Sequence, residues 1–374
     1  MQAWTSGRVV FMYDDLASTL SVWSSTVPVR VVSTSPKVSY TASAVATLEG
    51  DAIVWYDTAS ASTANLRWAR TDGGASLTVV TGTTVCNDVS RSAAGRVLTP
   101  ICAGALPSTF SIASIDAATG AATTLVTGAR GGWVSDPAGT RVFASTATDA
   151  KLYPTDGSAP LPVDTGNARN GLFTADGTNV LYDADGPSFE RVLRRASVTT
   201  GTPTTIASTI GGLEAASADG AFAAYSVVSS TTGPGGDLWV VATAGGAKHA
   251  VATTTTNAPV ASGFTTDGRY LLFTPSAAWG SSAIELDAYP TAGGAVKTLS
   301  SSVDSVSALG GSKVLYTVYG TTGDDLDWVD VSASSTFPTS IATNVHRYFL
   351  TPARDRIVYA QQYVAAGIYV VPVP

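Results

Sequence analysis

The chain is poor in charge, in histidine and in cysteine. Of its 374 residues only 13% are charged, two are histidines and two are cysteines. So small a number of histidines and cysteines argues against a histidine- or cysteine-based metal centre and against catalysis by paired histidines. The formal charge is −7 and no cluster of lysines or arginines occurs, so the basic stripe that neutralises nucleic-acid phosphates is missing. We expect no cofactor and no nucleic-acid partner.

Long apolar runs and well-known catalytic motifs are missing too. The longest apolar stretches hold four to six residues, whereas roughly 20 are needed to cross a bilayer. The opening residues lack the charged start and apolar core of a secretory signal. No nucleophile elbow, phosphate-binding loop or His-Glu-x-x-His motif occurs. We predict no membrane insertion, and a chain that either stays inside the cell or is preceded by a leader outside this sequence.

Most of the sequence is an internal repeat, in which a turn glycine precedes a short apolar run that mostly ends in an aromatic residue. The turn positions are Gly7, Gly50, Gly95, Gly139, Gly177, Gly220, Gly268, Gly311 and, with aspartate in place of glycine, Asp355. Successive positions are 38 to 48 residues apart, and a second turn follows most of them. Each unit therefore holds four strand-like segments, which is the size of one propeller blade.

The second segment of each unit indicates how the units pack. Runs such as Val180-Leu181-Tyr182 and Tyr270-Leu271-Leu272-Phe273 are apolar on consecutive residues, so both faces of the strand should be buried. A sandwich with one wetted face would alternate instead. The sequence thus predicts an all-β fold, a single closed β-propeller of four-stranded blades over residues 1–374, with a β-solenoid as the alternative.

The number of blades depends on the two ends. Residues 41–343 hold seven complete repeats, and residues 1–40 and 344–374 hold partial ones. If the partial repeats share one blade, the ring has eight blades, and if each stands alone it has nine. We predict eight, within a range of seven to nine, and we expect the chain to be part of a longer protein.

Three of the turns follow one pattern. They read Thr174-Ala175-Asp176-Gly177, Ser217-Ala218-Asp219-Gly220 and Thr265-Thr266-Asp267-Gly268. The units resemble the TolB-type propeller repeat, which has a Ser-Pro-Asp-Gly turn, an apolar strand ending in an aromatic residue, a third strand and a second Asp-Gly turn. All three turns lack the proline. The resemblance covers nearly the whole chain and implies a propeller in a bacterial envelope or outside the cell.

Acidic residues gather in the connections between the second and third strands. Equivalent loops of every blade open on one face of a propeller, so these carboxylates should form an acidic rim, and the connection that leads into the next blade adds His346 and Arg347 to the same face. The predicted binding residues are Asp14, Asp15, Asp183, Asp185, Asp324, Asp325, His346 and Arg347. The alternative is that the aspartates only start turns and keep the loops soluble.

Two smaller features remain open. Asp183 and Asp185 could supply oxygen ligands to a cation. Cys86 and Cys102 lie nine residues before and seven residues after Gly95, on two strands of one hairpin. In exact register they can form a disulfide, and a slip of one residue would place the thiols on opposite faces.

Taken together, these features favour a non-catalytic disc that presents a loop-rich face to a protein or glycan partner. We expect a monomer that is periplasmic or extracellular. One alternative is a propeller enzyme, a polysaccharide lyase or hydrolase that uses Asp183, Asp185 or His346. A second alternative is a sensor or scaffold domain of a larger cytosolic protein.

Overall fold

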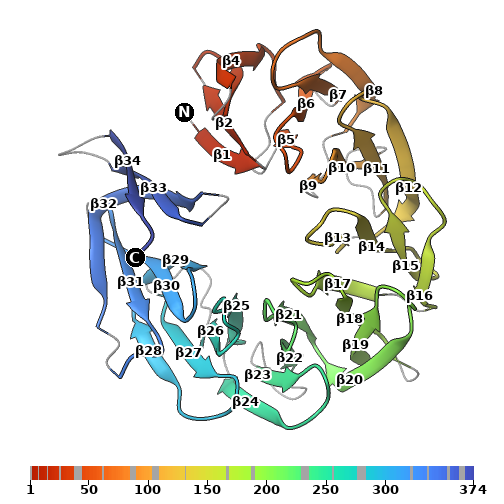
Figure 1. Ribbon diagram of the computed structural model, residues 1–374. Coiled ribbons are helices and arrows are strands. Elements are labelled where there is room, and N and C mark those ends of the chain that lie inside the picture. The colour runs from red at the N-terminus through yellow and green to blue at the C-terminus, as the bar shows by residue number, and fades with distance from the viewer. Residues whose placement is uncertain are drawn as a thin grey trace. The chain divides into compact units, whose positions relative to one another are not determined.

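The computed structural model shows a chain built from β-strands (Figure 1). It describes residues 2–6, 8–14, 16–24, 27–37, 44–60, 63–84, 90–102, 109–130, 132–165, 168–186, 190–228, 236–254, 257–275, 284–320, 323–334, 337–351, 354–361 and 367–374. Antiparallel pairing joins the strands into eight sheets, so the predicted all-β propeller fold with eight blades is confirmed. In these ranges no helix has the length and hydropathy that a membrane span requires.

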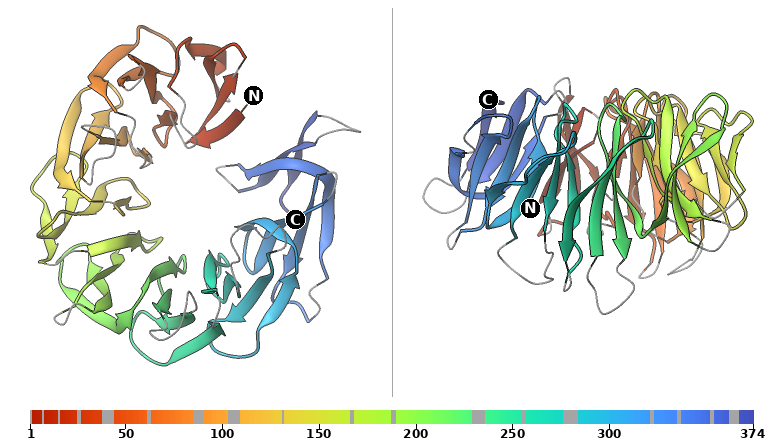
Figure 2. Two further views of the ribbon diagram at one scale, coloured as in Figure 1. Left: turned by 180° about the vertical axis from the view of Figure 1, so that it is seen from behind. Right: turned by 90° about the horizontal axis from the view of Figure 1, so that it is seen from below.

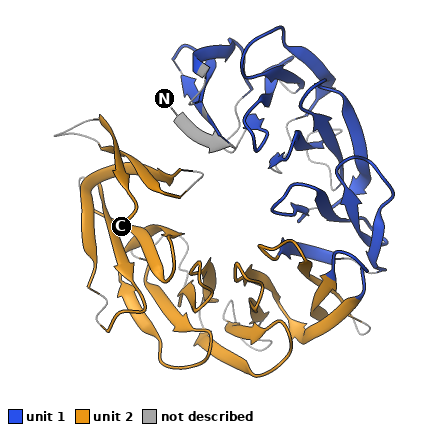
Figure 3. Cartoon of the chain, viewed as in Figure 1, with its two compact units in different colours: residues 1–173, 197–202 blue, residues 174–196, 203–374 orange. Residues whose placement is uncertain are grey.

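The chain divides into two compact units (Figure 3). Unit 1 comprises residues 1–173 and 197–202, and unit 2 comprises residues 174–196 and 203–374. The two units are described separately below.

Unit 1 contains four four-stranded sheets in which strands adjacent in sequence are also adjacent in the sheet. The strands of the first two sheets are β1 (Gln2–Ser6), β2 (Val9–Asp14), β3 (Thr19–Ser24), β4 (Val27–Ser33), β5 (Ala44–Ala46), β6 (Ala52–Thr58), β7 (Ala64–Arg70) and β8 (Leu77–Thr83). The strands of the next two are β9 (Arg91–Ala93), β10 (Arg96–Ile101), β11 (Phe110–Asp116), β12 (Ala122–Ala129), β13 (Val134–Ser135), β14 (Arg141–Ser145), β15 (Ala150–Pro154) and β16 (Leu161–Asp164). Each sheet is therefore an antiparallel meander.

The fifth sheet consists of β17 (Ala168–Phe173), β18 (Asn179–Asp185), β19 (Arg191–Ser197) and β20 (Pro203–Ile210). Unit 2 continues with three more sheets. Their strands are β21 (Gly212–Ala216), β22 (Phe222–Val228), β23 (Gly236–Ala242), β24 (Lys248–Thr254), β25 (Val260–Phe264), β26 (Tyr270–Thr274), β27 (Leu286–Pro290), β28 (Lys297–Ser300), β29 (Val303–Ala308), β30 (Lys313–Val318), β31 (Asp324–Asp330), β32 (Thr339–Leu350), β33 (Arg356–Gln361) and β34 (Gly367–Pro372). The last sheet has six strands, β29 to β34.

The second strand of a sheet is buried on both faces, as its continuous apolar sequence predicts. All five residues of β26 are buried. In unit 2 one core cluster contains Leu238 and Val240 of β23 together with Leu271 and Phe273 of β26, so neighbouring sheets pack face to face, and Figure 2 shows these sheets standing side by side. Burying each such side chain contributes about 1.5 to 3 kcal/mol.

The turn before the second strand is held by side-chain hydrogen bonds that recur between repeats. Thr265 Oγ1 donates to Asp267 Oδ1 at 2.6 Å, and Thr291 Oγ1, after the third strand, donates to the Gly268 carbonyl at 3.1 Å. Equivalent bonds run from Thr47 to Asp51, from Ser217 to Asp219, from Thr71 to the Gly50 carbonyl and from Thr155 to the Gly139 carbonyl. In the turns at Gly50, Gly220 and Gly268, the hydroxyl residue that opens the turn therefore helps to order it.

The two ends differ from the partial repeats expected at residues 1–40 and 344–374. Strand β1 precedes the first turn, so β1 to β4 form a complete sheet. At the other end β32 is 12 residues long. Its first half pairs with β31 and its second half with β33, which adds the last strands to a sheet that is already complete. The sequence could not reveal β1 because no turn signal precedes its five residues.

Candidate functional site

The predicted aspartates have different surroundings in the structure. Asp14 ends β2, and its Oδ1 accepts hydrogen bonds from the backbone N–H groups of Leu16 at 3.0 Å and Ala17 at 3.2 Å. This is the bonding of an aspartate that starts a turn. Asp15 lies outside the described residues.

Asp183 lies inside its sheet and not on a rim. Its side chain is fully buried, and its carboxylate forms an ion pair with Arg191, whose guanidinium also donates to the Gly211 carbonyl. The apolar run Val180 to Tyr182 suggests a strand that ends at the aromatic residue, but β18 continues to Asp185, so position 183 still faces the core. A ligand cannot reach Asp183 without breaking a buried ion pair.

The structure gives separate observations on the predicted cation site and on the predicted disulfide. Within the described ranges, no three His, Cys, Asp or Glu side chains lie close enough together to hold a metal ion. Asp185, at the end of β18, is half-buried. Cys102 is disulfide-bonded, and Cys86, the only other cysteine of the chain, lies outside the described residues.

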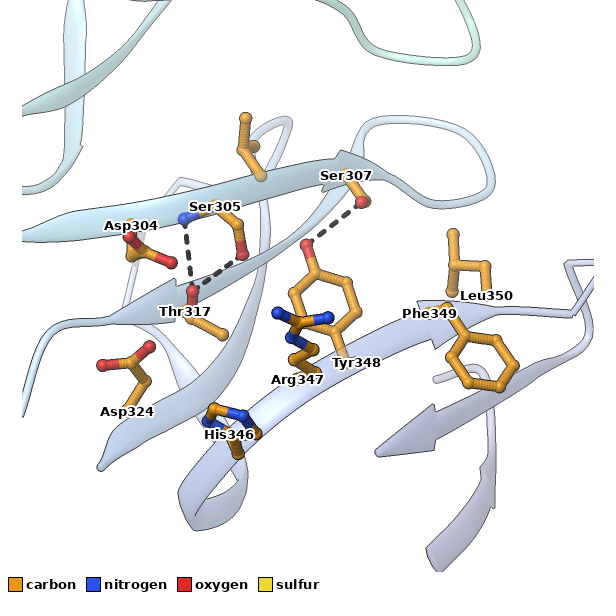
Figure 4. A pocket seen from close by; sticks show the side chains of 11 residues that line it. Asp304, Ser305, Ser307, Thr317, Asp324, His346, Arg347, Tyr348, Phe349 and Leu350 are labelled. Carbon is orange, nitrogen blue, oxygen red and sulfur yellow. Dashed lines mark hydrogen bonds between the residues drawn. The ribbon is translucent and has the colours of Figure 1, made fainter. Parts of the chain in front are cut away.

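Three predicted residues, Asp324, His346 and Arg347, lie together in one pocket of unit 2 (Figure 4). The pocket has a volume of about 460 Å³. Its lining is Asp304, Ser305, Val306 and Ser307 of β29, Thr317 of β30, Asp324 of β31, and His346, Arg347, Tyr348, Phe349 and Leu350 of β32. Asp325, the next residue along β31, is exposed outside this lining.

Two β-bulges aim side chains toward the pocket. The pairing of β29 with β30 shifts register between Val303 and Ser305, and the pairing of β32 with β33 shifts between Val345 and Arg347. The extra residues are Asp304 and His346, and both are exposed, whereas the valine before each is buried. A bulge releases one side chain from the regular alternation of a strand, and here it does so at the same place in two successive repeats.

The pocket has an acidic end and an apolar end. Asp324 pairs with Val345, so it lies beside His346. Figure 4 shows Asp304 and Asp324 at one end, Phe349 and Leu350 at the other, and Arg347 between them. Since a strand rises about 3.3 Å per residue, the segment from His346 to Leu350 spans about 13 Å.

Hydroxyl groups connect the pocket walls. Ser307 Oγ and Tyr348 OH are 3.0 Å apart, which links β29 to β32. Ser305 Oγ and Thr317 Oγ1 are 2.8 Å apart, and the backbone N–H of Ser305 donates to Thr317 Oγ1 at 3.2 Å. These bonds hold the walls in one arrangement.

The surroundings of Asp324 favour its protonated form. Burial raises the pKa of Asp324, and the carboxylates of Asp304 and Asp325 raise it further. A hydrogen bond from the Gly320 backbone and the charge of His346 act in the opposite direction, but the net direction of the shift is upward. A carboxylate with a raised pKa is stabilised when a cation approaches it.

Sequence reasoning missed Asp304, Ser307 and Tyr348. A register shift inside a strand leaves no mark in composition or spacing, so Asp304 looked like an ordinary strand residue. One signal was available, because Val303-Asp304 begins β29 and Val345-His346 begins the half of β32 that pairs with β33.

The fold is shared with solved structures of low sequence identity. A structure described as the eukaryotic initiation factor matches with 11% identity and a TM-score of 0.62, over 98% of this chain and 94% of that one. Porphyromonas gingivalis dipeptidyl peptidase 4 matches with 9% identity and a TM-score of 0.57, over 99% of this chain and 57% of the peptidase. No protein-family model and no curated protein matches the chain.

TolB structures were also found in the structural comparison. TolB from Acinetobacter baumannii matches with 14% identity and a TM-score of 0.36, over 75% of this chain and 77% of that one. Identities this low show the fold alone. The chain is an eight-bladed β-propeller.

Proposed function

We propose that this chain is a non-catalytic binding propeller, and that the pocket between β29 and β32 is its binding site. The observation that carries the proposal is the convergence of two carboxylates, an imidazole and a guanidinium in one pocket, on Asp304, Asp324, His346 and Arg347. A pocket with a few converging polar groups beside apolar side chains is the usual form of a ligand site.

The hydroxyl groups of the pocket argue against a serine or threonine nucleophile. A serine or threonine nucleophile needs a base within hydrogen-bond reach. Among the described residues, Ser305 bonds to Thr317, and Ser307 bonds to Tyr348, so these hydroxyls are tied to one another and not to His346. The enzyme alternative names Asp183, Asp185 and His346. Asp183 is buried in the core, so only Asp185 and His346 remain for that alternative.

The partner and its location complete the proposal. We favour a protein partner over a glycan for the reasons given in the next subsection. The disulfide at Cys102 supports a periplasmic or extracellular chain, because disulfides persist in oxidising compartments and are rare in the cytosol.

Ligand-observed NMR on the full chain tests the proposal. Four ligand classes are screened: capped cationic peptides, capped anionic peptides, neutral oligosaccharides and oligouronates. We expect at least one ligand class to bind the wild type. The same class should not bind the Ser307→Trp variant, in which the tryptophan side chain fills the pocket. The ligand should be recovered chemically unchanged after incubation. Arg347→Ala, at an exposed position, is the second variant in case the first does not fold. Binding of no class, or equal binding to all variants, would refute the site, and product signals that Arg347→Ala removes would make it an active site.

A further inference from the structure

We infer that the ligand of this pocket is an extended peptide that carries a lysine or arginine side chain on the same face as an apolar side chain. The inference rests on the proposed function and names the class of ligand. It follows from the charge of one end of the pocket, the apolar character of the other, and the length between them.

The acidic end fits a basic side chain. Asp304 and Asp324 come from different strands and line the same end of the pocket, so an ammonium or guanidinium group can reach both. Charge-assisted hydrogen bonds of this kind are about twice as strong as neutral ones. A carboxylate ligand would meet the two aspartates there and would be repelled.

The opposite end fits an apolar side chain. Phe349 and Leu350 are half-buried, and Leu350 packs against the core cluster that contains Val345 and Ile357. An extended peptide places residues i, i+2 and i+4 on one face, and a five-residue extended peptide is as long as the segment from His346 to Leu350, because both rise about 3.3 Å per residue. Arg347 lies between the two ends, where its guanidinium can donate to peptide carbonyl groups. A peptide supplies all three features at this spacing, whereas a neutral sugar supplies neither the cation nor the apolar group.

The same bulge recurs along unit 2 and provides a matched control. The first strands β21 and β25 also shift register, at Glu214 between Leu213 and Ala215, and at Ser262 between Ala261 and Gly263. Glu214 and Ser262 are exposed, as Asp304 and His346 are, but neither lines the pocket. Glu214 therefore has the charge and the bulge position of Asp304 without the pocket.

Calorimetric titration of the full chain with capped pentapeptides tests the inference. The probes are Lys-Thr-Leu-Thr-Phe, the same peptide with glutamate for lysine, the same peptide with threonine for lysine, and a neutral oligosaccharide. We expect only the lysine peptide to bind well. Asp304→Asn and Asp324→Asn should each weaken it about tenfold, since one lost charge pair costs on the order of 1.4 kcal/mol. Glu214→Gln should change its affinity less than about twofold.

The outcomes separate the two proposals. Tighter binding of the glutamate or threonine peptide, or of the oligosaccharide, would overturn the ligand class and leave the binding site in place. Equal weakening by Glu214→Gln and Asp304→Asn would also overturn it, because the acidic end would then have no special role. No binding of any probe here, nor of any class in the NMR screen, would remove both proposals.

Discussion

Ser307 Oγ and Tyr348 OH lie 3.0 Å apart across the pocket, and this contact joins the first strand of the last complete repeat to the second half of β32. Because β32 leaves β31 halfway along its length to pair with β33, its second half is free to take a different angle. The Ser307 to Tyr348 hydrogen bond ties that half of β32 to β29 and so helps to hold the two pocket walls together.

Tyr348→Phe should therefore weaken both the fold and the site. We expect the free energy of unfolding to fall by about 0.5 to 1.5 kcal/mol, the net value of one hydrogen bond, and the affinity for a bound ligand to fall as well. Tyr319→Phe is the matched control, because Tyr319 is 54% exposed. Urea denaturation measures the free energy of unfolding of both variants. Equal losses of stability would show that the Tyr348 hydroxyl does not stabilise the fold.

Two turn glycines, Gly95 and Gly139, allow two energetic costs of an alanine substitution to be measured apart. One is the cost of a left-handed backbone conformation, and the other is the cost of steric crowding. Gly95 and Gly139 have φ values of 60° and 66°, so alanine at either position loses about 1 to 2 kcal/mol in the left-handed region. A Cβ atom at Gly139 would lie 2.4 Å from Ala93 Cα, whereas one at Gly95 would have nothing within 4 Å. Gly139→Ala should be destabilised by about 1 to 3 kcal/mol more than Gly95→Ala. Equal thermal midpoints for the two variants would contradict the packing described here.

The sequence predicted the repeat, the four strands of most sheets and three residues of the pocket. Turn glycines and doubly buried strands leave local signals in the sequence. Asp324, His346 and Arg347 were expected in loops on one face, whereas they lie in strands β31 and β32 of one sheet. Asp183 was misplaced, since the end of a buried strand cannot be read from an apolar run alone. Asp304 was missed because a bulge is decided by pairing with a neighbouring strand, and the resemblance of Val303-Asp304 to Val345-His346 is a weak trace of it in the sequence.

Arg191→Met should be strongly destabilising. Arg191 pairs with the fully buried Asp183, and removing one partner of a buried pair leaves an uncompensated charge that costs about 3 to 5 kcal/mol. The double variant Asp183→Asn, Arg191→Met should regain most of that stability. The free energy of unfolding in guanidinium measures both effects, and a loss below about 1 kcal/mol in the single variant would mean that solvent reaches Asp183.

Asp287 should make the protein less stable as the pH rises through mildly acidic values. Its side chain is 5% exposed, and burial, followed by the nearby Glu285 carboxylate, raises its pKa from 3.8 to about 6. Between these two values the folded chain holds the proton and the unfolded chain has lost it. The free energy of unfolding therefore falls with rising pH by about 3 kcal/mol in this window and levels off above about pH 6.

Asp287→Asn cannot lose a proton, so its stability should lack this decline and exceed that of the wild type at neutral pH. Thermal midpoints at several pH values between about 4 and 7 measure the difference. A wild-type midpoint that rises with pH relative to the variant would show that the carboxyl is ionised at low cost, contrary to its burial.

Hydrogen exchange of the full chain, with and without a ligand found in the screen, tests the central claim most directly. If the pocket between β29 and β32 is the binding site, the ligand should slow exchange in peptides that cover residues 303–308 and 345–350, and should leave the other first strands unchanged. Protection confined to any other sheet, in a chain that binds the same ligand, would contradict the account.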